Sequence, residues 1–201
     1  MENLGNGPTV FVSDPCLDLD ASQILTWYMG SEELNLHEIL AAEIDLLARR
    51  LGCDRILYVG NSGGGFAALQ VASYSNVSGV VTFNPQIQID KYVPRIARTA
   101  QEVVFGEPSV SNNSVLKSRV DAIQRYSDIG FDKKVYFIQN TGDEMHYQNH
   151  FNPFQLAFER SEHPQKFKAI TPYLGPGHRV PPPAEYFEHV LEGAEFVFGS
   201  N

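Results

Sequence analysis

The sequence predicts an α/β fold, in which helices cover both faces of a mostly parallel central sheet. Short apolar segments alternate with helical patterns along most of the chain. These segments are hydrophobic throughout, as in parallel strands that are buried on both faces. With 201 residues, of which 43% are hydrophobic and 19% charged, the chain fits one domain, residues 1–201, around a single core.

The first half of the chain predicts three strands and two helices. Residues 9–13 are β-branched and aromatic, and Asp14-Pro15 ends that strand. Apolar residues then recur at helical spacing until Gly52, which ends the first helix. Asn84-Pro85 ends the third strand in the same way as Asp14-Pro15 ends the first. The expected strands are 9–13, 55–59 and 79–83, and the expected helices are 34–51 and 63–74.

The alternation is interrupted once and then resumes. Residues 86–130 hold two helical patterns, 92–104 and 115–126, and we expect them to form a cap-like insertion over the strand ends. Strand 134–139, a helix at 153–160, strand 166–171 and a last helix at 184–198 complete the pattern. A loop rich in glycine and proline, residues 174–183, separates the last strand from the last helix.

Gly60-Asn61-Ser62-Gly63-Gly64 stands between an apolar strand and an alanine-rich helix start. A sharp strand-to-helix turn of this kind forces its central serine to a positive φ angle and exposes the hydroxyl. Residues two before and two after the serine then approach so closely that only small side chains fit, and Gly60 and Gly64 meet that demand. The sequence therefore predicts Ser62 as a nucleophile, with the Gly63 amide free at the helix start.

A serine hydroxyl needs a histidine to take its proton and a carboxylate to orient that histidine. In a parallel sheet these partners sit on loops at the carboxyl ends of the strands. Asp143 follows one strand in Asn140-Thr141-Gly142-Asp143-Glu144, and His178 ends the loop after the last strand. The order serine, acid, histidine suits this arrangement. Glu144 is the nearest substitute for Asp143.

Each of these residues also has a simpler interpretation, as a turn serine, a turn-capping aspartate and a surface histidine. His146 and His150 have a spacing that suits metal binding, but no glutamate completes the zinc-peptidase pattern, so we expect structural roles for both. We expect Trp27 and Tyr28 to be a packed aromatic pair rather than a pocket wall. Asn84-Pro85-Gln86 should face the site, although its main role would be to end a strand.

Composition limits the classes of partner. The formal net charge of −9 argues against nucleic acid or an anionic membrane surface. No segment is long and apolar enough to span a membrane, and the first eight residues lack the apolar core of a signal peptide. Cys16 and Cys53 have no metal-type spacing. We therefore expect a cytoplasmic protein with reduced thiols that needs no metal or cofactor, and the oligomeric state stays open.

The elbow at Ser62, the pair Gly142-Asp143 and the pair Gly177-His178 together resemble the α/β-hydrolase fold, over most of the chain from about residue 9. The resemblance implies that Ser62 is the acyl-accepting nucleophile, His178 the general base and acid, and Asp143 the orienting carboxylate. It also implies that the Gly63 amide is one oxyanion donor.

One departure concerns the second oxyanion donor. In the family, further strands precede the region that residues 9–13 resemble, and a loop after one of them gives this donor. Residues 9–13 either pair beside strand 55–59, so that Asp14, Cys16 or Leu17 donates, or form the outer strand of a domain that lacks its central neighbour. The long helix after Asp14-Pro15 favours the second interpretation.

The function that follows is a serine hydrolase of a small acyl substrate, acting on an ester, thioester or amide through an acyl-enzyme. An acyltransferase would use the same residues. A non-catalytic hydrolase-like binding module is the alternative from another class. A phosphate-binding loop is a remoter one, because no lysine follows the glycines and the dinucleotide spacing is broken.

Overall fold

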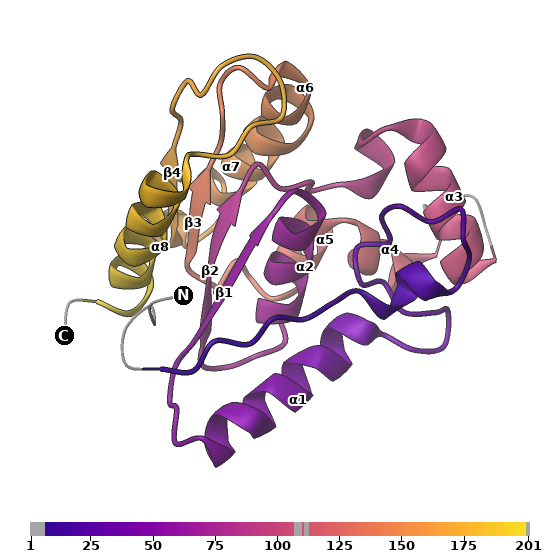
Figure 1. Ribbon diagram of the computed structural model, residues 1–201, viewed down its shortest axis with the longest axis horizontal. Helices are drawn as coiled ribbons and strands as arrows, with labels where there is room; N and C mark the ends of the chain where they lie inside the picture. The colour runs from indigo at the N-terminus through magenta and orange to yellow at the C-terminus, as the bar shows by residue number, and fades with distance from the viewer. Residues whose placement is uncertain (1–6, 107–109, 111–112, 200–201) are drawn as a thin grey trace.

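The computed structural model describes residues 7–106, 110 and 113–199. Its centre is one parallel sheet of four strands in the order β1-β2-β3-β4 (Figure 1). The strands are β1 (Ile56–Asn61), β2 (Ser78–Phe83), β3 (Val135–Ile138) and β4 (Phe167–Ile170). Because all four run the same way, their carboxyl ends meet at one edge of the sheet.

Alternate residues of the strands enter two separate cores, as the period of two in a strand requires. Val81 and Tyr136 pack against the last helix, α8 (Pro183–Phe198), on one face. Their neighbours Val80 and Phe137 belong to a larger core on the other face. That face is covered by α2 (Ser62–Ala72), α5 (Ala122–Asp128) and α7 (Asn152–Glu159), so the sheet has helices on both sides (Figure 1).

The remaining helices lie outside this layer. α1 (Leu36–Arg50) packs on α2, and α3 (Pro94–Phe105) ends at Gly106 in the left-handed region, with φ 71°. α4 (Ser114–Val120) and α5 form one expected helix that Asp121 divides, because its carboxylate caps the start of α5. Short helical turns complete the chain: η1 (Pro15–Asp18), η2 (Ile89–Lys91), α6 (Glu144–His146), η3 (Tyr147–Phe151) and η4 (Pro164–Lys166).

The structure confirms the α/β fold class and four of the five expected strands, with bounds that shift by one or two residues. The expected strand at residues 9–13 is wrong. This segment has no regular structure, and Phe11 is 73% exposed. Its β-branched and aromatic composition favours a strand, but within the described residues the segment forms no strand pairing. Residues 9–13 therefore do not pair with β1 as a strand.

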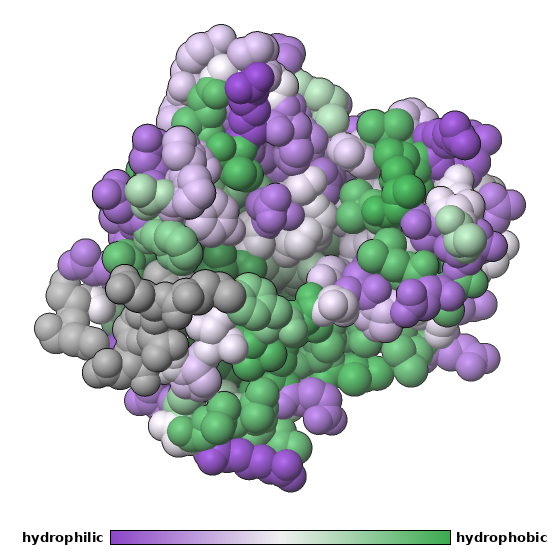
Figure 2. All heavy atoms as spheres, in the orientation of Figure 1, coloured by the Kyte–Doolittle hydropathy of each residue, from purple (hydrophilic) through white to green (hydrophobic). Residues whose placement is uncertain are grey.

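In the described part of the chain, β1 pairs only with β2, so its other side is an edge of the sheet. Val59 on β1 is 38% exposed, and Val10 and Val12 of the preceding segment are also exposed. Figure 2 shows apolar surface gathered in the lower middle of the face that Figure 1 presents. None of the described helices is long and apolar enough to cross a membrane.

Candidate active site

Ser62 lies at the sharp turn between β1 and α2, with a φ of 53°. A non-glycine residue in this region is strained, and the strain turns its side chain out of the strand. Gly60 makes the turn possible, since a Cβ on it would lie 2.2 Å from the carbonyl oxygen of Gly64. The Gly63 amide is in the first turn of α2, where no residue of the helix can accept its hydrogen bond.

The crowding around the turn differs from the expectation in one respect. A Cβ on Gly64 would meet nothing within 4 Å, so Gly64 needs no small side chain. The confined residue is the next one, Gly65, whose Cβ would lie 2.3 Å from Thr82 Oγ1 and 2.9 Å from Pro85 Cβ. Gly65 therefore sets how closely α2 lies on the end of β2.

Asp143 and His178 meet at the carboxyl edge of the sheet. Asp143 follows β3, and His178 lies on the loop between β4 and α8, which arches over the same end beside α6 (Figure 1). His178 Nδ1 is 2.6 Å from Asp143 Oδ2. Asp143 is only 5% exposed. Burial would raise the pKa of Asp143, but the hydrogen bond from His178 and the contacts with His146 outweigh it, so that this pKa is lowered.

A second histidine shares this carboxylate. His146 Nδ1 lies 3.1 Å from Asp143 Oδ1 and 3.0 Å from Oδ2, and the rings of His146 and His178 are stacked with centroids 4.2 Å apart. His146 is 1% exposed. Burial, helped by the charge of His178, lowers the pKa of His146 to about 4 although Asp143 opposes this. His146 is thus a neutral ring that supports the acid.

Ser62 is joined to this cluster through Gln86. Gln86 Nε2 lies 2.9 Å from Ser62 Oγ and 2.9 Å from His146 Nε2. Within the described residues, no direct hydrogen bond joins Ser62 to either histidine. Hydrogen bonds of a catalytic site are often long in the absence of substrate and shorten in the complex. Hydrogen bonds therefore connect Ser62 to Asp143 and His178 through Gln86 and His146.

Two asparagines hold the loops that carry the acid and the histidine. Asn140 Nδ2 donates to the carbonyl oxygens of Gly175 and Gly177, and its Oδ1 accepts from the amides of Gly142 and Leu174. The side-chain amide of Asn140 thus uses both of its donors and both of its acceptor sites to join the two loops. A second asparagine, at the end of β2, also connects these loops.

That asparagine is Asn84, whose Oδ1 accepts from the Asn140 amide at 2.6 Å, while its Nδ2 donates to the Arg179 carbonyl at 2.7 Å. Asn84 has a φ of 42° and is 1% exposed. The expectation that Asn84-Pro85-Gln86 faces the site is therefore confirmed for Asn84 and Gln86, which have more to do there than end a strand.

A strained loop lies against the turn that carries Ser62. Trp27 and Tyr28 have φ angles of 51° and 57°. The Asp14 carboxylate holds this loop, since it accepts from the Tyr28 amide and the Thr26 hydroxyl, both at 2.7 Å. The side chain of Leu25 packs against Gly63 of this turn. A Cβ on Gly63 would lie only 2.3 Å from Leu25 Cδ1. Trp27 is fully buried and packs edge-on against Tyr92, with ring centroids 5.9 Å apart. Tyr28 is half-buried and its hydroxyl donates to the Val12 carbonyl oxygen, so Trp27 packs as expected but not as a pair with Tyr28.

The turn after Asp14 limits the choice of a second oxyanion donor. The Cys16 amide donates to the Asp14 carboxylate at 3.0 Å, and the Leu17 amide donates to the Asp14 carbonyl at 3.3 Å. Both amides are therefore engaged within η1 in this arrangement. Of the three amides that the sequence offered for this role, these two are not free.

Asp143, His146 and His178 each offer a ligand atom, and these atoms lie within 4.8 Å of one another. Two tetrahedral ligands of one zinc ion, each bonded at about 2.0–2.1 Å, would be roughly 3.3 Å apart. The Asp143–His178 distance of 2.6 Å is instead that of a charge-assisted hydrogen bond. We therefore interpret the cluster as hydrogen-bonded rather than as a zinc site.

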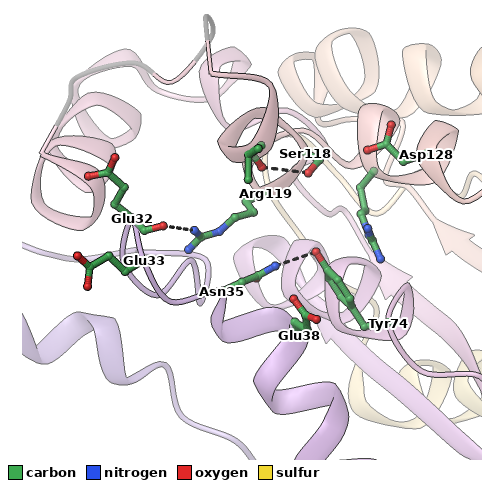
Figure 3. Close-up of a pocket in the computed structure, with 10 residues that line it drawn as sticks. Glu32, Glu33, Asn35, Glu38, Tyr74, Ser118, Arg119 and Asp128 are labelled. Atoms are coloured by element: carbon green, nitrogen blue, oxygen red, sulfur yellow. Dashed lines mark hydrogen bonds between the residues drawn. The ribbon is translucent and has the colours of Figure 1, made fainter.

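A polar pocket of about 470 Å³ lies between the start of α1 and α4, and none of the residues above lines it. Figure 3 shows Arg119 pointing toward Glu32, and Asn35 bonded to Tyr74. Arg119 is 3% exposed and donates to several carbonyl oxygens of the loop that precedes α1. This contact supports the far end of the loop that carries Trp27.

Gln86 and His146 make contacts in the site that were not expected from the sequence. For His146 a signal existed, because its position three residues after Asp143 places both on one side of a helical turn. For Gln86, the position at the end of a strand predicted its location but not its partners.

Cys16 and Cys53 are both free thiols.

No protein-family model matches the sequence, and no curated protein matches it. Solved structures do match. The capsule O-acetyltransferase of Neisseria meningitidis serogroup A has 18% sequence identity and a TM-score of 0.57, over 85% of this chain and 67% of that one. An S-formylglutathione hydrolase from Agrobacterium tumefaciens has 16% identity and a TM-score of 0.59, over 81% of this chain.

Prolyl oligopeptidase B from Galerina marginata is also similar, with 15% identity and a TM-score of 0.58 over 86% of this chain. This chain spans about two thirds of the O-acetyltransferase, 58% of the hydrolase and 25% of the oligopeptidase. These similarities show that the chain has the α/β-hydrolase fold, which hydrolases and an acyltransferase share.

Proposed function

We propose that this protein is a serine hydrolase that cleaves a carboxylic ester, thioester or amide through an acyl-enzyme. The observation that carries the proposal is the placement of Ser62 at a strained strand-to-helix turn, on the same sheet edge as the 2.6 Å pair of Asp143 and His178. A strained serine and a paired acid and histidine are the parts that acyl transfer requires.

In the first half of the reaction, Ser62 Oγ attacks the acyl carbon and its proton passes to His178 Nε2. The carbonyl oxygen becomes negatively charged, and the Gly63 amide donates to it. Asp143 stabilises the positive imidazolium that forms on His178. The intermediate then collapses as His178 returns the proton to the leaving group, and the acyl group stays on Ser62.

In the second half, water gives a proton to His178 and attacks the acyl carbon. His178 then returns the proton to Ser62 Oγ as the bond from that oxygen to the acyl carbon breaks, which releases the acid and restores the serine hydroxyl. An alcohol in place of water would make the protein an acyltransferase. That alternative is supported by the similarity to an O-acetyltransferase, which has itself been solved with CoA. A CoA thioester would then be the acyl donor. In the expected insertion at residues 86–130, α3 and α4 would be the helices that select the substrate.

Ser62→Ala tests the proposal. The purified protein should cleave a p-nitrophenyl acetate ester and should react with a fluorophosphonate probe, which labels only an activated serine. Ser62→Ala should abolish labelling and reduce cleavage by about 10³-fold or more. Ser127→Ala is the matched control, because Ser127 is exposed on α5 and its side chain makes none of the site contacts described above.

The same experiment separates the alternatives. A folded wild-type protein that the probe does not label would indicate a binding module and overturn the proposal. Ester cleavage that persists unchanged in Ser62→Ala would also overturn it. To distinguish hydrolysis from transfer, an alcohol acceptor is added and the acylated product is measured against the free acid.

A further inference from the structure

Gln86 is a fully buried residue whose side-chain amide touches three polar groups. Its Oε1 lies 3.1 Å from Trp27 Nε1, and its Nε2 lies 2.9 Å from both Ser62 Oγ and His146 Nε2. Trp27 is itself fully buried, and His146 is 1% exposed. Water cannot replace these contacts easily, so the amide is committed to all three partners.

The chemistry of Trp27 fixes which way the amide faces. An indole nitrogen can only donate a hydrogen bond, so the atom of Gln86 that faces it must be the oxygen. The amide NH₂ group therefore faces Ser62 and His146. An NH₂ group also only donates. The orientation thus follows from the partners and needs no direct view of hydrogen atoms.

The first consequence concerns His146. Its Nε2 must accept the hydrogen bond from Gln86, so Nε2 carries no proton. Nδ1 then carries the proton and donates it to Asp143. The groups packed around this ring are Asp143, the stacked ring of His178 at 4.2 Å, His150 at 5.1 Å and Tyr92 at 5.8 Å.

Of these neighbours, only Asp143 favours a charged His146. Burial opposes that charge most strongly and lowers the pKa of His146 to about 4, and the charge of His178 acts in the same direction. His150 also stays neutral, since burial lowers its pKa to about 3. A protonated His146 would place a second positive charge against the ring that must accept a proton from Ser62.

The second consequence concerns the nucleophile. Ser62 Oγ accepts the other amide hydrogen of Gln86, which leaves the hydroxyl hydrogen free to point elsewhere. Asp143 accepts the Nδ1 proton of His178, so the Nε2 of that ring keeps its lone pair when neutral. The arrangement favours proton transfer from Ser62 to His178 rather than to His146.

We propose that Gln86, oriented by Trp27, is a positioning residue that keeps His146 in its neutral Nδ1–H form and turns the Ser62 hydroxyl toward His178. Its value for catalysis rests on the function proposed above. The protonation pattern itself does not, because it follows from the contacts of Gln86 alone.

The experiment is ¹⁵N NMR of protein labelled at histidine, with a His146→Gln variant to assign the resonance. In the wild-type protein, His146 should show the neutral Nδ1–H tautomer from pH 8 down to pH 5. This measurement needs no variant of Gln86. An Nε2–H tautomer, or an imidazolium at pH 7, would overturn the proposal.

Gln86→Glu then tests the cause. A carboxylate accepts and cannot donate, so it should draw a proton onto His146 Nε2 and shift the titration of His146 upward by at least one pH unit. Gln165→Glu adds the same charge at an exposed position and should shift nothing. Identical His146 titrations in wild type and Gln86→Glu would contradict the role of the amide, provided that far-ultraviolet circular dichroism shows both to be folded.

Trp27→Phe separates orientation from contact, because it keeps an aromatic ring and removes the indole donor. His146 should then show both tautomers, while wild type shows one. For activity, Gln86→Glu should lower kcat by up to about 10²-fold at pH 7 with little change in KM. Absent activity and probe labelling in wild type would sink the catalytic function, yet would leave the tautomer result standing.

Discussion

The carbonyl oxygen of Gly142 accepts a hydrogen bond from the amide of Gly177 at 2.8 Å. Each of these glycines precedes a member of the site, Asp143 or His178. The two loops are therefore joined through their backbones as well as through their side chains. The distance between the acid and the histidine depends on how closely the loops approach at this point.

Gly142→Ala should separate these loops. A Cβ there would lie 2.1 Å from the Gly175 carbonyl oxygen, and a backbone atom cannot move aside cheaply. A misplacement of about 1 Å costs up to roughly 10²-fold in rate. We expect kcat/KM for an activated ester to fall 10- to 100-fold. Thr141→Ala, an exposed change in the same loop, should have little effect, and equal losses in both variants would contradict the prediction.

Gly60→Ala and Gly64→Ala should differ in stability although both lie in the nucleophile turn. A Cβ on Gly60 would meet the Gly64 carbonyl at 2.2 Å, whereas one on Gly64 would meet nothing within 4 Å. Overpacking costs about 1–3 kcal/mol, so Gly60→Ala should lower the free energy of unfolding by at least that amount. Gly64→Ala, inside a helix, should be neutral or stabilising by about 0.5–1 kcal/mol. Urea unfolding measures both, and equal values would count against the turn geometry.

Arg119→Met should destabilise the loop that carries Trp27. The guanidinium donates to the carbonyl oxygens of Ser31 at 2.7 Å and Leu34 at 2.9 Å, and also to that of Met29. A buried acceptor that loses its donor costs about 1–3 kcal/mol.

We expect Arg119→Met to lose several kcal/mol of unfolding free energy, measured by urea denaturation, and to expose residues 25–34 to hydrogen exchange. Arg49→Met, on the exposed side of α1, is the control. Unchanged exchange in residues 25–34 would show that Arg119 does not hold the loop.

Stability should fall as the pH drops from 6.5 toward 4. Burial lowers the pKa of His37 to about 4, of His146 to about 4 and of His150 to about 3. An unfolded histidine titrates near 6.5, so the unfolded chain binds more protons in this window. The stabilisation is complete above pH 6.5 and is lost as the pH falls to the folded pKa.

Each of these histidines contributes on the order of 3 kcal/mol across that window. Asp143, whose pKa is lowered below its ordinary value of 3.8, loses its contribution only at more acidic pH. Urea unfolding at pH 7.5, 6.0 and 5.0 should show a progressive loss. A stability that stays constant over this range would contradict neutral burial of the three rings.

Local sequence patterns predicted most of the strands and helices of the fold. β1 and α2 were predictable because a glycine-rich segment typical of a sharp turn separates an apolar strand from an alanine-rich helix. Asp143 and His178 were predictable from chain order, since parallel strands bring their following loops to one edge. The absence of a strand at residues 9–13 was not predictable, because composition shows that a segment can form a strand but not whether it pairs.

Contacts distant in sequence were out of reach for a different reason. Gln86 meets Trp27 across 59 residues and His146 across 60. No local rule gives the distance between loops that belong to different strands. The left-handed pair Trp27 and Tyr28 was equally hidden, because only tertiary contacts such as those of Asp14 hold bulky residues in that region.

The outer side of β1 presents backbone donors and acceptors that pair with no strand in the described residues. An open, partly apolar strand edge is a template onto which another polypeptide can add by main-chain pairing. Lysine or proline on an edge strand normally prevents such pairing, but β1 contains neither residue. A strand added at this edge would extend the sheet beside the strand whose end carries Ser62.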